Sequence, residues 1–131
     1  MDKLIKKLLK IAKDEDCVVR LEETSNDQLW HKSIYRPIVF TATGTQSNII
    51  VYYHNAKIKL LALAHEVGHL LDPTITTLYN KKVSFGIDYH KNPLAFERRA
   101  SKWAIDFLKK NRYKELKEAK QIYSKCLETY K

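Results

Sequence analysis

The chain contains 131 residues, the size of a single domain that buries a core without disulfides, so residues 1–131 are expected to form one domain. Its two cysteines, Cys17 and Cys126, lie far apart without metal-binding spacing, which suits a reducing compartment, and we expect a cytoplasmic protein. The net charge is +9, from 24 Lys and Arg against 15 Asp and Glu. This charge suits an acidic partner or nucleic acid, but the excess is spread over both ends without a DNA-reading motif, so direct nucleic-acid binding is not favoured.

The N-terminal half predicts an amphipathic helix followed by short strands. Residues 3–13 place apolar side chains at helical spacing, with lysines on the opposite face. Such a helix either packs on the core, which we favour, or lies on a membrane surface. No segment is long enough to span a bilayer. We expect a polar loop at 22–32, a turn at 43–47, and strands at 17–21, 36–42 (entered through Pro37) and 48–53.

The C-terminal half predicts three helices. The first covers about 55–71 and stops where a proline at position 73 bars its continuation. Residues 72–92 have no clear pattern and could border a substrate cleft. Asn92 as N-cap and Pro93 in the first turn begin a helix that runs to about 110, and a last helix covers 114–129. The predicted fold class is α+β, with at least one hairpin in a small sheet covered by helices.

The run His65-Glu66-Val67-Gly68-His69 carries the chemistry of the chain. Histidines four residues apart lie one turn apart on the same helix face, so both imidazoles can reach one metal ion. Glu66 projects about 100° away and can reach a water on that metal without being a ligand. This is the H-E-x-x-H arrangement of zinc hydrolases, in which the glutamate is the general base. The alternative is a helix with two ordinary histidines and a surface glutamate. The strongly apolar flanking residues make this alternative less favoured, because they indicate a largely buried helix, in which polar side chains need partners.

A catalytic zinc usually has three protein ligands, and the downstream candidates for the third are Asp72, Asp88, His90 and Glu97. Asp72 abuts the proline and is more simply explained as a helix terminus. Glu97 is favoured because small residues follow it on its own helical face. The alternative for Glu97 is a solvated position at a helix start, where the helix dipole favours a carboxylate.

Small residues on two predicted helices indicate how Glu97 would reach the histidines. Ala100 and Ala104 share the face of Glu97, and Ala64 and Gly68 lie one turn apart on the metal helix. A glycine inside a helix costs about 1 kcal/mol relative to alanine, so close helix packing is a sensible reason for Gly68. Two helices meeting along these faces would bring the carboxylate to the imidazoles.

Two segments resemble a known family. Residues 63–70, Leu-Ala-His-Glu-Val-Gly-His-Leu, are similar to the LAHELGHL segment of ImmA/IrrE-type metallopeptidases. Residues 97–108 resemble the ExEAnxFAxxLL helix of that family, with Trp103 in place of phenylalanine, and residues 47–52 resemble the strand before the metal helix. The similarity covers about residues 47–108, and the first 46 residues agree only in layout. One departure is that Arg98 and Arg99 stand where many members carry a second acidic residue.

The resemblance implies His65, His69 and Glu97 as ligands of Zn²⁺, with Glu66 as the catalytic carboxylate. It also implies a minimal zincin-like domain. Members of the family act in bacteria, phages and mobile elements, where they are anti-repressors that cleave a helix-turn-helix repressor and so release its genes. The expected function is therefore a zinc-dependent endopeptidase with a repressor as its protein substrate.

The expected mechanism needs a further donor for the negative charge of the tetrahedral intermediate, and Tyr89 and His90 are candidates. The alternative is that both are ordinary loop surface. Two other functions stay open. One is a non-catalytic zincin-like module that sequesters a repressor. The other is a basic nucleic-acid-associated protein, suggested by the net charge of +9.

Overall fold

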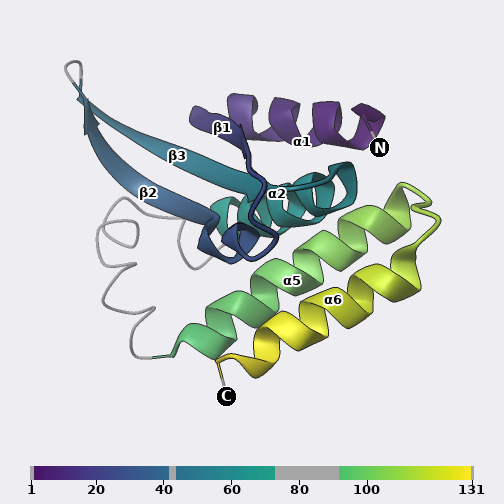
Figure 1. Cartoon of the computed structure of the whole chain (residues 1–131). Coiled ribbons are helices and arrows are strands. Elements are labelled where there is room, and N and C mark those ends of the chain that lie inside the picture. The colour runs from purple at the N-terminus through teal and green to yellow at the C-terminus, as the bar shows by residue number, and fades with distance from the viewer. Residues whose placement is uncertain (1, 42–43, 73–91, 131) are drawn as a thin grey trace.

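The computed structural model describes the backbone of residues 2–41, 44–72 and 92–130, and the side chains of these ranges outside 37–45. Within them the fold is α+β, as the sequence predicts. The elements in chain order are α1 (Asp2–Asp14), β1 (Cys17–Glu23), the 3₁₀ helix η1 (Leu29–Lys32), β2 (Ile34–Thr41), β3 (Gly44–Tyr53), α2 (Ala56–Leu70), α5 (Pro93–Lys110) and α6 (Leu116–Glu128) (Figure 1).

The sheet has the strand order β1-β3-β2. β1 pairs parallel to β3, and β2 pairs antiparallel to β3, so the expected hairpin is confirmed. Pro37 lies inside β2 rather than at its entry. The strand pairing tolerates the proline because β2 pairs with one strand, β3, among the described residues, and because its register shifts between Arg36 and Val39.

Two sequence expectations for this region are wrong. The turn expected at 43–47 is too long, because β3 begins at Gly44, and Gln46 and Ser47 pair with neighbouring strands. Ladder hydrogen bonds there override a turn-like composition. The loop expected at 22–32 contains the end of β1 and the short helix η1, which ends at Lys32.

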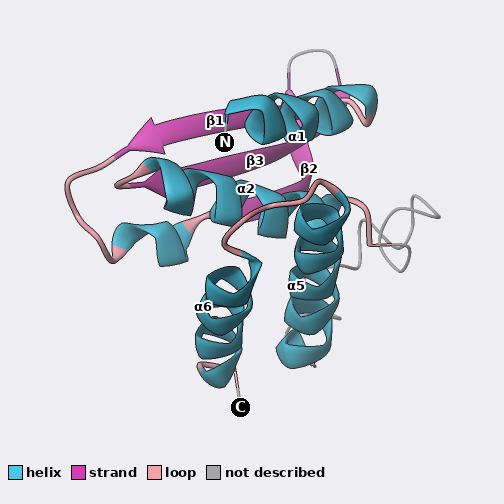
Figure 2. Ribbon diagram, turned by 90° about the vertical axis from the view of Figure 1, so that its right-hand side faces the viewer, coloured by secondary structure: helices cyan, strands magenta, loops and turns pink. Residues whose placement is uncertain are grey.

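Helix α2 lies at the centre of the molecule. It packs against β3 and β2 on one side and against α5 on another, while α1 packs on α2 and β1 (Figures 1 and 2). The interpretation of residues 3–13 as a core-packing helix is confirmed, because the apolar face of α1 is buried. The side chains of Leu60, Leu61 and Leu63 are fully buried. Among the described helices, none is both long and apolar enough to cross a membrane.

The contact between α2 and α5 is close because Gly68 faces the backbone of Ala100. A Cβ added at Gly68 would lie 2.5 Å from the carbonyl oxygen of Ala100 and 2.9 Å from its Cα. Both distances are shorter than a carbon contact allows. The expected pairing along small residues is therefore confirmed, and Ala64, Ala100 and Ala104 are all fully buried at or beside it.

We expect Gly68→Ala to lower the free energy of unfolding by about 1–2 kcal/mol, because overpacking outweighs the gain in helix propensity. Urea denaturation would measure it. Ser124→Ala, at an exposed position of α6, is the control and should change stability little. A Gly68→Ala protein as stable as the parent would mean that α5 is free to move away from α2.

Candidate metal centre

Two histidines of α2 and one carboxylate of α5 converge in the centre of the molecule. Nε2 of His69 lies 2.5 Å from Oε2 of Glu97, and Nε2 of His65 lies 3.4 Å from the same oxygen. The imidazole rings are 4.8 Å apart and nearly perpendicular, at 87°. Helical spacing alone places the two rings side by side, and the close approach of α5 adds the carboxylate.

The donor atoms of His65, Glu66 and His69 lie within 4.8 Å of one another, so this group could hold a metal ion. His69, Glu66 and Glu97 are each less than a tenth exposed. The alternative of a surface glutamate in the motif is therefore wrong, and so is the alternative of a solvated Glu97. Imidazole nitrogens and carboxylate oxygens together suit a divalent ion of borderline softness.

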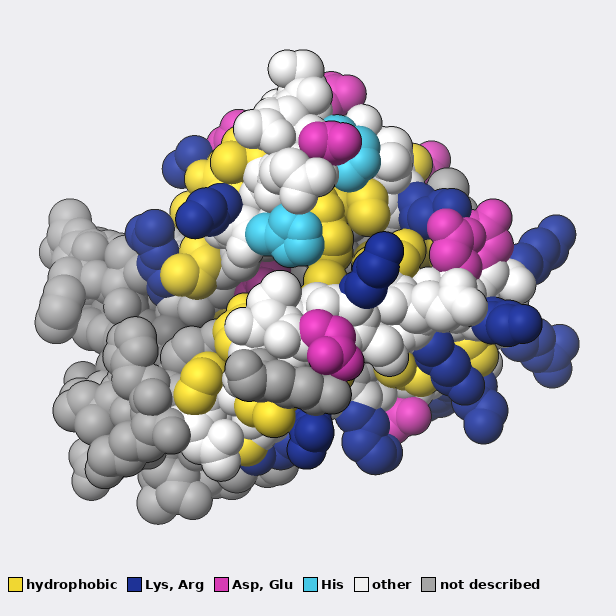
Figure 3. Space-filling model, turned by 60° about the horizontal axis from the view of Figure 1, so that its bottom comes forward, with side chains coloured by type: hydrophobic (Ala, Val, Ile, Leu, Met, Phe, Trp, Pro, Cys, Tyr) yellow, Lys and Arg dark blue, Asp and Glu magenta, His cyan; other side chains and the backbone are white. Residues whose placement is uncertain are grey.

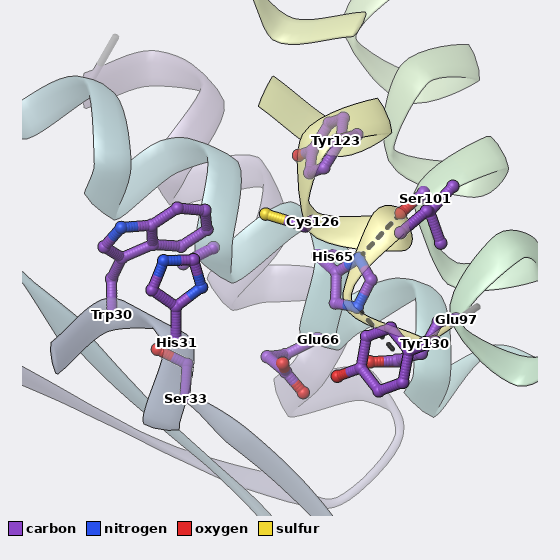
Figure 4. A pocket seen from close by; sticks show the side chains of 12 residues that line it. Trp30, His31, Ser33, His65, Glu66, Glu97, Ser101, Tyr123, Cys126 and Tyr130 are labelled. Carbon is purple, nitrogen blue, oxygen red and sulfur yellow. Dashed lines mark hydrogen bonds and ion pairs between the residues drawn. The ribbon is translucent and has the colours of Figure 1, made fainter. Parts of the chain in front are cut away.

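Residues of α5 and α6 contact the imidazole of His65. Its Nδ1 lies 3.1 Å from Oγ of Ser101, and the ring of Tyr123 stacks on it at 6.0 Å between centroids (Figure 4). The hydroxyl of Tyr123 donates a hydrogen bond of 2.6 Å to the carbonyl of Leu61, one helical turn before His65. When Nδ1–H donates to Ser101, the tautomer is fixed and Nε2 keeps its lone pair for a metal.

Glu66 lies against β2. Its carboxylate accepts a hydrogen bond from the peptide N–H of Tyr35. Burial raises the pKa of the Glu66 carboxyl to about 8, against the opposing effects of His69 and of the Tyr35 peptide. A carboxyl in this range can both accept and return a proton near neutral pH.

His65, His69 and Glu97 shift one another's pKa values. Burial lowers the pKa of His65 despite its hydrogen bond with Glu97. Burial also acts against a charge on His69, but the hydrogen bond with Glu97 and the charges of Glu66, Glu97 and Asp72 outweigh it, so this pKa is raised. Burial alone would raise the pKa of Glu97, yet its hydrogen bonds to the two histidines hold it well below its usual range. These interactions therefore favour a protonated His69 beside an ionised Glu97.

Asp72 and Arg99 form a second connection between α2 and α5. Asp72 is 2% exposed, and its Oδ2 accepts a hydrogen bond of 2.9 Å from Nε of Arg99. The side chain of Arg99 also lies over the ring of Phe96. The helix-terminus interpretation of Asp72 is consistent with its place after α2, and Arg99 supplies the counter-charge that its burial requires.

A cavity of about 70 Å³ opens beside the donors. Its lining combines His65, Glu66 and Glu97 with residues of η1 and of the end of α6 (Figure 4). Figure 3 shows the corresponding face of the molecule, where histidine and acidic side chains appear around a hollow and most Lys and Arg side chains lie toward the rim. Tyr89 and His90, the candidates for stabilising the negative charge, lie outside the described residues, as does Asp88.

The sequence analysis missed several residues of this site. Ser101 carried a usable signal, because it lies four residues after Glu97 and therefore on the same helix face. Tyr123 lies in the last helix, where an aromatic residue at helical spacing gives the same pattern whether it packs on the core or supports a site. Trp30 and His31, which line the cavity, stand in a polar segment that gave no signal at all.

We expect Ser101→Ala to weaken binding of a divalent ion by about 10- to 100-fold, because His65 loses the hydrogen bond that orients its ring. Co²⁺ is a suitable probe, titrated in competition with a chromophoric chelator. Ser124→Ala is the matched control on an exposed face of α6. Equal affinity in the two variants would show that packing alone orients His65.

We expect the free energy of unfolding to fall above pH 10, in part because Tyr35 resists ionisation in the folded state. Burial raises the pKa of Tyr35 above its ordinary value, so the folded state keeps this proton where the unfolded chain loses it. For one such group, the free energy of unfolding decreases by up to about 1.4 kcal/mol per pH unit. Below pH 10 both states are protonated and the contribution does not vary. Urea titrations from pH 9 to 11 should show a shallower decline for Tyr35→Phe, and no change for the control Tyr130→Phe, a residue that is 38% exposed. Parallel curves for parent and Tyr35→Phe would contradict this.

The comparisons with known proteins add nothing to this geometry. No family model, no curated protein and no solved structure matches the chain.

Proposed function

We propose that this chain is a zinc-dependent endopeptidase of the ImmA/IrrE type. The observation that carries the proposal is the convergence of His65, His69 and Glu97 on one point. Glu66 is buried beside them and a cavity opens next to the group. A helix that merely contained two histidines would not require a buried carboxylate from another helix, since burying charges is costly.

The donor set fits zinc. Two imidazoles and one carboxylate form the three-ligand set of zinc peptidases, which leaves the fourth position to water or substrate. The hydrogen bond of His65 with Ser101 is the kind of outer support that such ligands have. A bound dication would compete with a proton for the same nitrogen and oxygen atoms of His69 and Glu97. His65, His69 and Glu97 are therefore the proposed ligands.

A bound zinc would polarise the carbonyl of the substrate and would lower the pKa of the attacking water. The chain's own contribution is the carboxylate of Glu66, which takes a proton from the attacking water and returns it to the leaving amine. The peptide N–H of Tyr35 fixes the direction of this carboxylate. Burial keeps the affinity of Glu66 for the proton high enough for transfer in both directions, although a nearby dication would lower it.

The proposed substrate is a helix-turn-helix repressor, and this part rests on the motif resemblance. Cleavage would relieve repression of phage, mobile-element or stress genes. The net charge of +9 would favour association with an acidic segment of such a protein. A module that binds the repressor without cutting it is the second candidate, and the experiments below separate the two.

The first experiment measures zinc in the purified protein by elemental analysis. We expect about one zinc per chain, and a marked loss in Glu97→Ala, because one of three ligands is removed. Asp106→Ala, which removes an exposed acid from the same helix, should keep its zinc. If the parent bound no zinc even after reconstitution, the metallopeptidase proposal would be wrong.

The second experiment tests the role of Glu66. We expect Glu66→Gln to keep zinc and to lose about 100-fold or more of its cleavage rate, because the amide cannot accept the proton of the water. The substrate would be the repressor encoded beside the gene for this chain, and the readout would be its fragments by mass spectrometry. Asp106→Asn serves as the control.

The two candidate functions give different results with the same variant. Cleavage by the parent and intact repressor with Glu66→Gln would support the peptidase. Relief of repression in cells that persists in Glu66→Gln would support sequestration instead. An uncut repressor, with zinc loaded and any inducing signal present, would count against repressor cleavage.

A further inference from the structure

We propose that the cavity beside His65 is a specificity subsite that accepts a short aliphatic side chain of the substrate, of about the size of valine. This inference rests on the proposed peptidase function and names the chemistry of its substrate next to the cleaved bond. It also assigns the selectivity chiefly to Leu127 of α6 and to Tyr130, which follows that helix, and the catalytic step itself uses neither residue.

The position of the cavity supports this role. Ala62, Glu66 and His65 from α2 line it together with Glu97 from α5. Ala62 lies one turn before Glu66 on the same helix face, and its small side chain leaves space beside the catalytic carboxylate. A substrate whose carbonyl reached the donors would therefore place a neighbouring side chain in this space.

The remaining lining comes from both sides of the opening, and it combines three uncharged or weakly basic polar residues, His31, Ser33 and Ser101, with apolar and aromatic side chains. Trp30 of η1 lies on one side, and Tyr123 of α6 lies on the other, with Tyr130 near the donors (Figure 4). Leu127 of α6 also lines the cavity. No lysine or arginine is among the described lining residues. A bound dication would balance the two negative charges of Glu66 and Glu97. The subsite would then carry no net charge and would favour an uncharged side chain.

The volume limits the size of that side chain. An apolar cavity of about 150 Å³ holds a benzene molecule, whereas this one has about 70 Å³. A methyl or isopropyl group fits, and a phenyl ring does not unless a lining residue is truncated. Leu127 is partly buried, and Tyr130 is 38% exposed near the end of the described chain. Truncating either would enlarge the cavity without removing a metal donor.

The test measures binding of N-acetyl amino-acid hydroxamates to the zinc-loaded full chain by calorimetry. The hydroxamate group binds zinc, so glycine, alanine, valine and phenylalanine derivatives differ only in the side chain offered to the cavity. We expect the valine derivative to bind about 10-fold tighter than the glycine derivative, since it buries three more carbon atoms. The phenylalanine derivative should bind no tighter than the glycine derivative.

Two enlarging variants and one matched control assign the selectivity to the lining. Leu127→Ala and Tyr130→Ala should each tighten binding of the phenylalanine derivative relative to the valine derivative by about 5-fold or more. Ile122→Ala removes a partly buried aliphatic residue of the same helix that does not line the cavity, and it should leave the order unchanged. Tyr130→Ala keeps the test decisive if Leu127→Ala fails to fold.

The outcomes separate this inference from the proposed function. If all four derivatives bound with equal affinity, or if Leu127→Ala and Tyr130→Ala behaved like Ile122→Ala, the subsite would be wrong while the zinc site stood. If the chain bound no zinc, or if the zinc-loaded chain bound no hydroxamate at all, both proposals would be overturned.

Discussion

The close approach of α5 to α2 at Gly68 and Ala100 is the contact on which the site depends. The histidines belong to one helix and the carboxylate to another, and a glutamate side chain spans only a few ångströms. Glu97 reaches both Nε2 atoms because the backbone of Ala100 lies where a Cβ of residue 68 would be. Side chains at such a contact set the distance between helix axes. The small residues therefore determine the geometry of groups that they do not touch.

The interior of this small domain carries an unusual amount of charge. Glu66, His69, Asp72 and Glu97 are all less than a tenth exposed. Each would be costly alone, and the structure satisfies them in pairs: His69 with Glu97, Asp72 with Arg99, and Glu66 with the peptide of Tyr35. The apolar remainder of α2, with Leu60, Leu61 and Leu63 fully buried, offsets this cost. A dication at the histidines would fit a group already arranged to hold charge.

The sequence predicts features that depend on neighbouring residues better than features that depend on contacts between distant segments. Local signals were sufficient for the helices: the Asn92 cap with Pro93 places the start of α5 correctly, and helical spacing pairs His65 with His69. Glu97 required an inference across two helices, which small residues made possible. The extension of β3 to Gly44 could not be predicted, because pairing with β2 and β1 overrides the local turn preference. Trp30 and His31 reach the cavity through tertiary packing that leaves no local pattern.

Helix α6 connects the proposed metal ligands to the cavity. Tyr123, Leu127 and Tyr130 recur at spacings of three and four residues, so one stripe of the helix and the residues after it faces the site. Its first member stacks on His65 and hydrogen-bonds to Leu61, whereas its later members contact the cavity beside the donors. Lys57 secures the other end of the helix through ion pairs with Glu115 and Glu118.

The stripe of Tyr123, Leu127 and Tyr130 would separate two proposed properties of the site, its metal affinity and its preference for a substrate side chain. A change at Tyr123 would alter the support of His65 and the wall of the cavity together, so metal affinity and side-chain preference would change at once. Changes at Leu127 or Tyr130 would reshape the cavity without reaching the α2–α5 contact that holds the donors in place. In the proposed peptidase, side-chain selectivity would therefore change through the C-terminal end of the stripe, while the arrangement of His65, His69 and Glu97, set by the contact of Gly68 with Ala100, stays constant.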